Sequence, residues 1–434
     1  MNNYQLVKNT EWKEVEINGE DKDIPLFWKL SAIKNIAQEK KKRRITKEND
    51  NFCINLEDIS QGDGKIISSS TWKENKSIKT IFEKNDILYG KLRPYLKKYW
   101  VADKEGLCST EIIVLSNTQE TIPLYLYSLI IEEKFNSYIN EKAEGTRMPR
   151  ARWEDIKSFQ LALPPLEQQS AIASILSSQE SIIQDIESLI SKYESRFQYL
   201  SEELLSGRLR VKEVGGQTIF YKNADDNWKE VEINGEMKEI PHDWDLDTIG
   251  GINIPLIKTG VKLYSGKLPF YATGEVEDFN LSLQPTGFFS YDTKPSRANL
   301  AVYDNSIYMA RMKNTLKILN FAKKQDILLS TGFLGLRPNP IFIDRNFLYN
   351  LIQTSSFQER KNQNCKGSTQ ESLSDSAAQS IQIIIPLLEE QILIGLLLKD
   401  VTALIDQQKE FLTKERQKFD WLLDNLLSGK YLVK

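Results

Sequence analysis

The chain contains its own opening segment twice. Residues 12–20 and 228–236 both read WKEVEINGE, and the match extends without a gap over 11–30 and 227–246. A second and longer match aligns 159–212 with 381–434 at a constant offset of 222 residues. A period of this length is far longer than that of a solenoid or propeller repeat. The sequence therefore predicts two domain-sized halves that share their ends and differ in their middles.

Size and composition are those of a globular protein. The chain has 434 residues, of which 40% are hydrophobic, so it has room for two to four packed domains. The N-terminus lacks an apolar signal region and there is no apolar run near 18 residues, so a cytoplasmic protein is expected. Cys53, Cys108 and Cys365 lie far apart, and His242 is the one histidine. They form no cluster with zinc-ligand spacing, so the cysteines are expected to be small buried apolar residues.

The second match predicts a long amphipathic helix in each half. Pro164 suits the start of the first helix and Gly207 its end, whereas Pro386 and Gly429 mark the second. Each helix would have roughly 40 residues and span about 60 Å, which favours an antiparallel pair over two ordinary core helices in separate domains. The apolar spacing predicts that the helices pair through Ile182, Ile186, Leu189, Tyr193, Leu200, Leu404, Phe411, Phe419 and Leu422.

The segments ahead of the helices have the patterns of mixed α/β domains. DILYGKL, STEIIVL, SIQIIIPL and KSFQLALPPL are typical of short strands, whereas 124–143 has helical spacing. The predicted class is α+β, with two α/β domains separated by a pair of long antiparallel coiled-coil helices and related by an internal pseudo-two-fold. The predicted boundaries are 1–163 and 213–385 for the domains, with 164–212 and 386–434 for the helical segments.

No catalytic motif is recognisable in the chain. It has neither a GxxxxGK[ST] phosphate loop nor a GxGxxG after a strand, and one histidine excludes HExxH. Many Asp and Glu are present, but no spacing distinguishes a pair for a metal-dependent nuclease. Catalysis by this chain is therefore not expected, and no metal site is predicted.

Basic clusters in the first block predict contacts with nucleic acid. The chain has 57 Lys and Arg against 60 Asp and Glu, so binding must come from local patches rather than bulk charge. Residues 34–47 hold seven basic side chains against one Glu, and 84–98 and 142–152 are also basic. A single charge run is usually a solvated face, but three in one near-neutral block favour a surface that neutralises phosphates. The candidates are Lys41, Lys42, Arg43, Arg44, Lys91, Arg93, Lys97, Thr146, Arg147 and Arg150.

The second block offers fewer cations, at positions that partly match those of the first. Some lie on a glycine-rich segment, and others follow the strand SIYMA or belong to KGSTQ, which aligns with EGTRM of the first block. Loops of this kind supply the polar side chains that read base edges. The candidates are Lys258, Lys262, Tyr264, Lys267, Arg311, Lys313, Lys366, Ser368 and Thr369.

The duplicated pattern resembles the specificity subunit of type I restriction–modification systems. The resemblance is carried by IPxxW near each domain start, the DIL…LRP and LCST-like strands, a G[ST] loop, and PPLEQQ opening a helix that ends LLSGR. The second copy departs as PLLEEQ…LLSGKYL. The resemblance implies two target recognition domains, each binding one half of a bipartite asymmetric double-stranded DNA sequence. It also implies helices that set the spacing and dock methyltransferase subunits, two in number, within a complex that contains restriction and translocase subunits.

By the same resemblance, S-adenosylmethionine, ATP and Mg²⁺ belong to partner subunits and this chain needs no cofactor. Two other functions remain open from the residues alone. One is a coiled-coil scaffold that presents two protein-binding domains, and the other is a nuclease with an unrecognised metal site.

Overall fold

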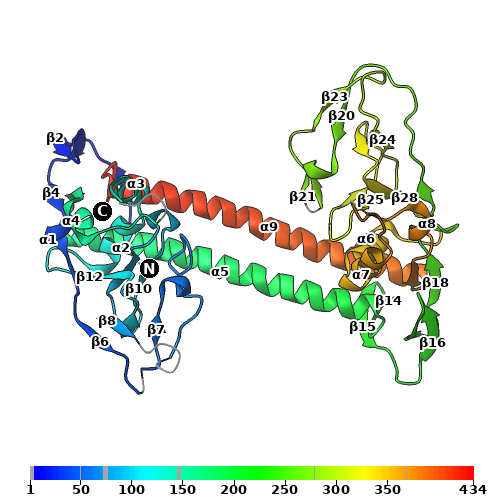
Figure 1. Cartoon of the computed structure of the whole chain (residues 1–434), viewed down its shortest axis with the longest axis horizontal. Helices are drawn as coiled ribbons and strands as arrows, with labels where there is room; N and C mark the ends of the chain where they lie inside the picture. Colours follow the sequence, from blue (N-terminus) through cyan, green and yellow to red (C-terminus); the bar gives the residue numbers. More distant parts are fainter. Residues whose placement is uncertain (1–3, 49, 72–76, 144–147, 278, 369) are drawn as a thin grey trace. The chain divides into compact units, whose positions relative to one another are not determined.

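Two long helices, α5 (Leu166–Leu205) and α9 (Leu388–Leu427), each belong to both structural units of the chain (Figure 1). The computed structural model describes all residues except 1–3, 49, 72–76, 144–147, 278 and 369. The first unit comprises residues 1–188 and 410–434, and the second comprises 189–409. Each unit therefore contains one globular block, one half of α5 and one half of α9.

The first block is built on two four-stranded sheets. The inner sheet has the order β10 (Tyr99–Val101), β9 (Ile87–Gly90), β12 (Ile112–Asn117), β5 (Ala37–Glu39). The outer sheet has the order β6 (Arg43–Ile45), β8 (Ile78–Phe82), β11 (Gly106–Cys108), β7 (Cys53–Ile54). The helices are α1 (Ile33–Ile36), α2 (Pro123–Ile131), α3 (Glu133–Lys142) and α4 (Trp153–Ser158).

The inner sheet is covered on both faces, which explains its continuous apolar strands. Tyr89 and Ile113 point into a core shared with α2, α3 and the ends of α5 and α9. Leu88 and Val114, each directly adjacent to one of these residues on its strand, point into a second core shared with the outer sheet. Successive strand residues face opposite sides, so a strand between two layers is apolar at every position.

The second block repeats this plan. Its inner sheet has the order β19 (Leu256–Ile257), β28 (Phe333–Leu336), β25 (Ser306–Ala310), β26 (Ile318–Phe321). Its outer sheet has the order β23 (Gly287–Phe289), β20 (Leu268–Tyr271), β27 (Leu328–Ser330), β24 (Ala298–Ala301). The helices are α6 (Arg345–Gln353), α7 (Ser355–Gln363) and α8 (Asp375–Ala378). The predicted duplication and the mixed α+β class are thereby confirmed.

The outer sheets differ at their edges. Both contain three strands in the same arrangement, with β11 parallel to β7 and antiparallel to β8, and β27 parallel to β20 and antiparallel to β24. In the first block the fourth strand, β6, pairs with β8. In the second block the fourth strand, β23, pairs with β20, on the opposite edge. The outer sheets of the two blocks therefore share three strands and differ in which edge carries the fourth.

The repeated segments at the ends of the halves form paired strands. Each WKEVEINGE belongs to a hairpin, β2 (Trp12–Ile17) with β3 (Glu20–Pro25) and β16 (Trp228–Ile233) with β17 (Glu236–Pro241). The next pairs are β4 (Lys29–Ala32) with β13 (Gln160–Leu163) and β18 (Asp245–Thr248) with β29 (Gln382–Ile385). The remaining pairs are β1 (Leu6–Lys8) with β30 (Tyr431–Val433), β14 (Leu209–Val214) with β15 (Gln217–Lys222), and β21 (Val276–Glu277) with β22 (Asn280–Leu281).

Packing against the helix ends explains why the two matched segments are retained together. Gly429 follows α9 with φ +71°, and a Cβ there would lie 2.3 Å from Cγ of Pro25 and 3.3 Å from the Trp28 ring. Gly207 follows α5 with φ +77° and meets Pro241 and Trp244 in the same way. Glycine is the residue that both accepts this conformation and leaves room for the proline. The Ile-Pro…Trp motif and the Leu-Leu-Ser-Gly motif are thus two sides of one contact in each unit.

Cys53, Cys108 and Cys365 are buried and unpaired, as predicted. Residues 124–143 form two helices, because Glu132 has extended backbone angles and separates α2 from α3. Within the described parts of the chain, no helix has the length and apolar character needed to cross a membrane.

Candidate nucleic-acid interface

The strongest basic cluster lies along a sheet edge in the first block. Arg43 is the first residue of β6, the outermost strand, and pairs with Thr80 of β8. Lys42 and Arg43 are exposed, and the Lys41 side chain is 71% exposed although its Nζ lies 3.2 Å from Glu39. An edge strand with exposed cations presents a row of donors that suits phosphate oxygens.

Arg44 has a structural role beside this edge. Its guanidinium donates to both carboxylate oxygens of Asp50, at 2.6 and 2.7 Å. The hydrogen bond from Arg44 is the main cause that lowers the pKa of Asp50 to about 2. Because these N–H groups are used within the chain, Arg44 ties β6 to Asp50, whereas Lys41, Lys42 and Arg43 are the more exposed cations of the cluster.

The second cluster forms a junction between two segments of the first block. Leu92 and Arg150 form an isolated bridge, and the Arg93 amide donates to the Pro149 carbonyl at 2.7 Å. Lys91 Nζ donates to the carbonyl of Thr110 at 2.7 Å, and burial lowers the pKa of Lys91. Lys91 is therefore a packing residue, whereas Arg93 is exposed with a left-handed φ of +53°.

Other candidates of this cluster carry intramolecular ion pairs. Lys97 pairs with Glu133, and Arg150 pairs with Glu111 at 3.2 Å. Both pairs are at least one-third exposed, so they are weak and can be exchanged for a phosphate. Thr146 and Arg147 lie outside the described residues.

The second block repeats the junction at the equivalent place. Met312 and Ser372 form the isolated bridge, and the Lys313 amide donates to the Glu371 carbonyl at 3.0 Å. Arg311 donates to the carbonyls of Phe333 and Leu373, at 3.1 and 3.0 Å, and to Asp375 at 2.6 Å. The sequence thus brought the correct segments together, but Arg311 fastens them rather than facing solvent.

The remaining candidates at this junction are accessible. Lys313 pairs with Glu371 at 2.8 Å, and Lys366 and Ser368 are exposed. Lys366 also exchanges backbone hydrogen bonds with Ser372 at 3.1 Å. Thr369 lies outside the described residues.

Sequence reasoning missed a buried lysine that organises this junction. Lys361 of α7 is 1% exposed, and its Nζ donates to the carbonyls of Thr315 and Ala310 at 2.8 and 3.3 Å. Burial lowers its pKa. At the offset of 222 residues the first block has Ile139, which is fully buried. A lysine at an apolar position of an amphipathic helix was the available signal.

The glycine-rich segment of the second block carries a surface of cations and aromatic rings. Lys258, Lys262 and Lys267 are exposed, and the Tyr264 hydroxyl donates to the Phe289 carbonyl at 3.0 Å. The Tyr264 ring lies edge-on to Tyr291, with centroids 5.7 Å apart. Sequence reasoning did not include the neighbours Lys294, which lies over the Tyr291 ring, and Arg297, which lies over Phe270. The exposed cations suit phosphate contacts, and the half-buried rings of Tyr264 and Tyr291 suit base contacts, whereas Phe270 is buried.

The long helices contact each other along a heptad seam within each unit. Buried or half-buried side chains recur at alternating intervals of four and three residues. In α5 they are Ile172, Leu176, Gln179, Ile183, Ile186, Ile190, Tyr193, Phe197, Leu200 and Leu204. In α9 they are Ile394, Leu398, Val401, Ile405, Gln408, Leu412, Glu415, Phe419, Leu422 and Leu426.

The pairing is antiparallel in both units. In the first unit the N-terminal half of α5 meets the C-terminal half of α9, where Gln179 donates to Glu415 at 2.5 Å and Glu187 pairs with Arg416 at 2.7 Å. In the second unit the other halves meet, and Glu194 pairs with Lys409 at 2.7 Å.

Part of the predicted pairing stripe is corrected. Ile186, Tyr193, Leu200, Phe419 and Leu422 occupy seam positions. However, Ile182, Leu189 and Phe411 are 41%, 36% and 44% exposed, and Leu404 is half-buried beside the seam. An apolar residue adjoins each of the exposed three, so helical spacing alone allowed two stripes. The heptad spacing that begins at Ile172, Leu176 and Gln179 continues through Ile183 and Ile190, which are therefore the seam residues.

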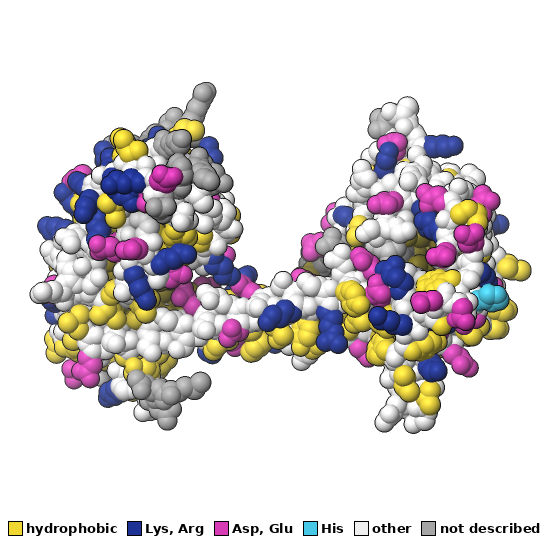
Figure 2. All heavy atoms as spheres, turned by 90° about the horizontal axis from the view of Figure 1, so that it is seen from below, with side chains coloured by type: hydrophobic (Ala, Val, Ile, Leu, Met, Phe, Trp, Pro, Cys, Tyr) yellow, Lys and Arg dark blue, Asp and Glu magenta, His cyan; other side chains and the backbone are white. Residues whose placement is uncertain are grey.

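The helix pair consequently has two different sides. The ion pairs of Glu187 and Glu194 follow the seam on one side. By heptad position, Ile182, Leu189, Leu404 and Phe411 flank the seam on the other. Hydrophobic side chains follow the helices on the face drawn in Figure 2, which also shows Lys and Arg gathered on the surface of the first unit.

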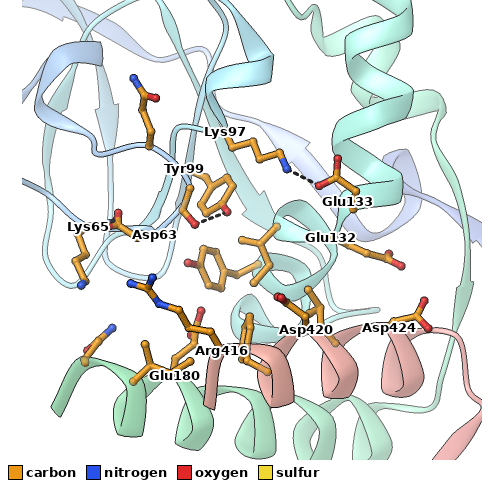
Figure 3. A pocket seen from close by; sticks show the side chains of 18 of the residues that line it. Asp63, Lys65, Lys97, Tyr99, Glu132, Glu133, Glu180, Arg416, Asp420 and Asp424 are labelled. Carbon is orange, nitrogen blue, oxygen red and sulfur yellow. Dashed lines mark hydrogen bonds and ion pairs between the residues drawn. The ribbon is translucent and has the colours of Figure 1, made fainter. Parts of the chain in front are cut away.

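Each block has a cavity beside the junction of two short helices. The first, of about 820 Å³, is lined by Glu132 and Glu133 at the α2–α3 junction and by Asp420 and Asp424 of α9 (Figure 3). The second, of about 640 Å³, is lined by the equivalent Thr354 and Ser355 and by Gln198 and Glu202 of α5. Burial raises the pKa of Glu180, on the wall of the first cavity, to about 7.

In the described residues, no group of three or more His, Cys, Asp or Glu is arranged to hold a metal ion. The candidate site is a set of exposed cations and polar loops around a junction that is repeated in each block, with a basic sheet edge in the first block and a cation–aromatic segment in the second. Such a surface can bind a polyanion.

Comparison with known proteins identifies the family. The family model described as "Type I restriction modification DNA specificity domain" matches residues 25–192 and again 241–414. The chain belongs to this family. It contains two copies of the specificity domain, each match ending within a long helix.

Individual relatives agree with the family assignment. The putative type I restriction enzyme MjaX specificity subunit of Methanocaldococcus jannaschii is 25% identical, over 99% of this chain and 99% of the relative. The MjaVIII specificity subunit of the same organism is also 25% identical, over 76% of each chain. The type I restriction enzyme EcoDI specificity subunit of Escherichia coli is 24% identical over 44% of each.

Solved structures show the same fold. The type I restriction–modification S subunit from M. genitalium has a TM-score of 0.53 and 18% identity, over 95% of this chain and 98% of that one. A chain from a structure of the complex assembly and conformational transition of the type I R-M system has a TM-score of 0.52 and 17% identity, over 94% and 99%. This specificity-domain fold is thus shared along nearly the whole chain.

Proposed function

We propose that this chain is the sequence-specific DNA-recognition subunit of a type I restriction–modification complex, and that each recognition domain binds one half of a bipartite asymmetric target. The observation that carries the proposal is the double specificity domain, with exposed cations on both blocks. The scaffold alternative is not favoured, because it leaves both the family and the paired basic surfaces unexplained.

The unlike sheet edges support an asymmetric target. The edge strand β6 carries Arg43, whereas β23 of the second block has the sequence GFF and adds to the opposite edge. Domains that present different side chains at different edges read different base sequences.

DNA binding tests this assignment directly. The triple variant Lys41→Ala, Lys42→Ala, Arg43→Ala is compared with the control Lys8→Ala, Lys192→Ala, Lys399→Ala, which removes three exposed lysines elsewhere. Binding to genomic DNA fragments is measured by fluorescence anisotropy between 50 and 200 mM salt. The proposal expects weaker binding and a shallower salt dependence for the first variant, by about 0.9 for each phosphate that is no longer neutralised, but not for the control. Equal salt slopes would favour the scaffold.

The apolar side of the helix pair supports docking of methyltransferase subunits. Leu189 and Phe411 are equivalent residues at the offset of 222, and both are exposed. Two equivalent surfaces suit two copies of one partner. Leu189→Glu is expected to weaken one copy's binding and Phe411→Glu the other's, as measured by the mass of the assembled complex.

The helices also set the distance between the half-sites in this proposal. Deleting seven residues from each helix preserves the seam, because the heptad period is seven. The shortened protein is expected to methylate targets with a changed spacer and unchanged half-site letters. Mapping methylated bases measures both features in one experiment.

Catalysis is assigned to the partner subunits. S-adenosylmethionine, ATP and Mg²⁺ would be bound there, and the complex would act on DNA in the cytoplasm. The purified chain is expected to leave plasmid DNA intact in the presence of Mg²⁺. Persistent nicking that co-purifies with the chain would instead support the nuclease alternative.

A further inference from the structure

The side of the helix pair that carries the ion pairs of Glu187 and Glu194 has its acidic residues on one helix and its basic residues on the other. On this side α5 presents Glu187 and Glu194, whereas α9 presents Lys409 and Arg416. Each acid meets a base of the other helix at 2.7 Å. At the offset of 222 residues, Glu187 is equivalent to Lys409 and Glu194 to Arg416. The two copies of the repeat thus carry opposite charges at equivalent positions.

The seam contains a polar pair with the same asymmetry. Gln179 of α5 is 4% exposed, and its Nε2 donates to Oε2 and to the backbone carbonyl of Glu415, at 2.5 and 3.3 Å. The equivalent residues are Val401 and Tyr193. Val401 has no polar side-chain group, and Tyr193 offers one hydroxyl in place of a carboxylate.

The duplication creates a competing arrangement in which like helices pair. In an antiparallel pair of two α5 helices from two copies, Glu187 would face Glu194, and Gln179 would face Tyr193. In a pair of two α9 helices, Lys409 would face Arg416, and the Glu415 carboxylate would face Val401. Both alternatives replace two attractions by two repulsions and leave a seam polar group without its partner.

We propose that these residues make α5 select α9 and reject a second copy of itself. The partner that the α5 surface fits is a helix with bases opposite Glu187 and Glu194 and with a carboxylate opposite Gln179. Flanking charges and one polar seam position are the features by which coiled coils choose partner and register. If the proposed function holds, this selection closes each chain on itself, so that its own two recognition domains share one helix pair.

The test uses full-length chains with reversed charges. One variant carries Glu187→Lys and Glu194→Lys, a second carries Lys409→Glu and Arg416→Glu, and a third combines all four changes. Matched controls, Asp185→Lys and Lys399→Glu, alter exposed charges away from the seam. Unfolding midpoints are measured at low salt and in 1 M salt, where the Debye length is about 3 Å.

Each two-site variant is expected to melt about 3 °C or more below the unchanged chain at low salt. The four-site variant is expected to recover most of the lost midpoint, since its interhelical pairs are restored with reversed sign whereas the pair of Glu187 with Lys65 is not. The controls should change little, and the differences should shrink in 1 M salt. A four-site variant that melts as low as the two-site variants would overturn the proposal.

A second experiment measures partner choice itself. The two two-site variants are co-expressed with different affinity tags. Within each, the helices repel one another, but α5 of one chain matches α9 of the other. The expected product is a particle of two chains that carries both tags, with mass confirmed by light scattering. A mixture in which both chains stay single, or in which tags combine at random, would show that charge does not select the partner. If a two-site variant fails to accumulate alone, its recovery on co-expression with the matching variant, and not with itself, gives the same readout.

Discussion

Gln179 of α5 and Glu415 of α9 form a hydrogen bond of 2.5 Å inside the helix seam of the first unit. Gln179→Ala removes the donor and leaves the Glu415 carboxylate in the seam with fewer partners. We expect a loss of about 1–3 kcal/mol in the free energy of unfolding, measured by urea titration. The neighbouring exposed residue gives the control, Ser178→Ala, which should cost little.

Replacing both partners by leucine has the opposite expected result. In Gln179→Leu, Glu415→Leu no polar group is left unsatisfied and the seam becomes apolar at this level. We expect stability equal to or above that of the unchanged chain, because paired polar groups are often no better than well-packed apolar ones. A double variant less stable than Gln179→Ala would contradict this account.

Glu180 predicts a pH dependence of stability. Burial raises the pKa of its carboxyl from 4.5 to about 7, so the folded protein holds the proton more tightly than the unfolded chain. The protonated Glu180 carboxyl therefore makes its full contribution to the stability of the folded protein below about pH 4.5, and this contribution is lost as the pH rises through about 7. Glu180→Gln should be more stable than the unchanged chain by about 1–3 kcal/mol at pH 8 and nearly equal to it at pH 4.5. Asp185→Asn, on the exposed face of the same helix, should show no such pH-dependent difference.

The glycine after α9 predicts a large effect from one methyl group. Gly429→Ala adds a Cβ that would lie 2.3 Å from Pro25, in addition to the strain of a left-handed φ of +71°. Gly216 has φ +75° with no atom within 4 Å of its Cβ position, so Gly216→Ala isolates the backbone strain. We expect about 1 kcal/mol for Gly216→Ala and clearly more for Gly429→Ala, measured as shifts in unfolding free energy.

Lys361 predicts a defect confined to one half-site. Lys361→Met fills a similar volume but removes the donor that reaches the Thr315 and Ala310 carbonyls. The loop between β25 and β26 should then lose its fixed geometry, and DNA binding should weaken in a manner that depends on the second half-site. Competition with oligonucleotides altered in one half-site at a time measures this. Comparable loss at both half-sites would indicate general destabilisation instead.

The sequence predicted the repeated parts of the fold better than the divergent parts. The long helices were recognisable because alignment of the two copies gives the same start and stop signals. At Ile182 and Leu189 the predicted seam is displaced by one residue from the observed seam. The next residues, Ile183 and Ile190, are also apolar, so the helical spacing fits either helix face. The break at Glu132 was missed because apolar and charged residues continue through it without glycine or proline.

The candidate interface was predictable in position but not in chemistry. Alignment of the two halves matched the segment of Arg311 and Lys313 with that of Lys91 and Arg93. The structure has equivalent isolated β-bridges in these two segments. Long-range packing decides whether a cation faces solvent or a backbone carbonyl. Arg43 is exposed, whereas Arg311 donates to the carbonyls of Phe333 and Leu373. Similarly, the role of Lys361 depends on carbonyls 46 and 51 residues away.

The three strands common to both outer sheets have two outer edges. The first block adds β6 at one edge, and the second block adds β23 at the other. Additions at such a border leave the inner sheet and its helices undisturbed. A change of the edge strand can therefore alter the side chains that one block presents, while the inner sheet and the other block keep theirs.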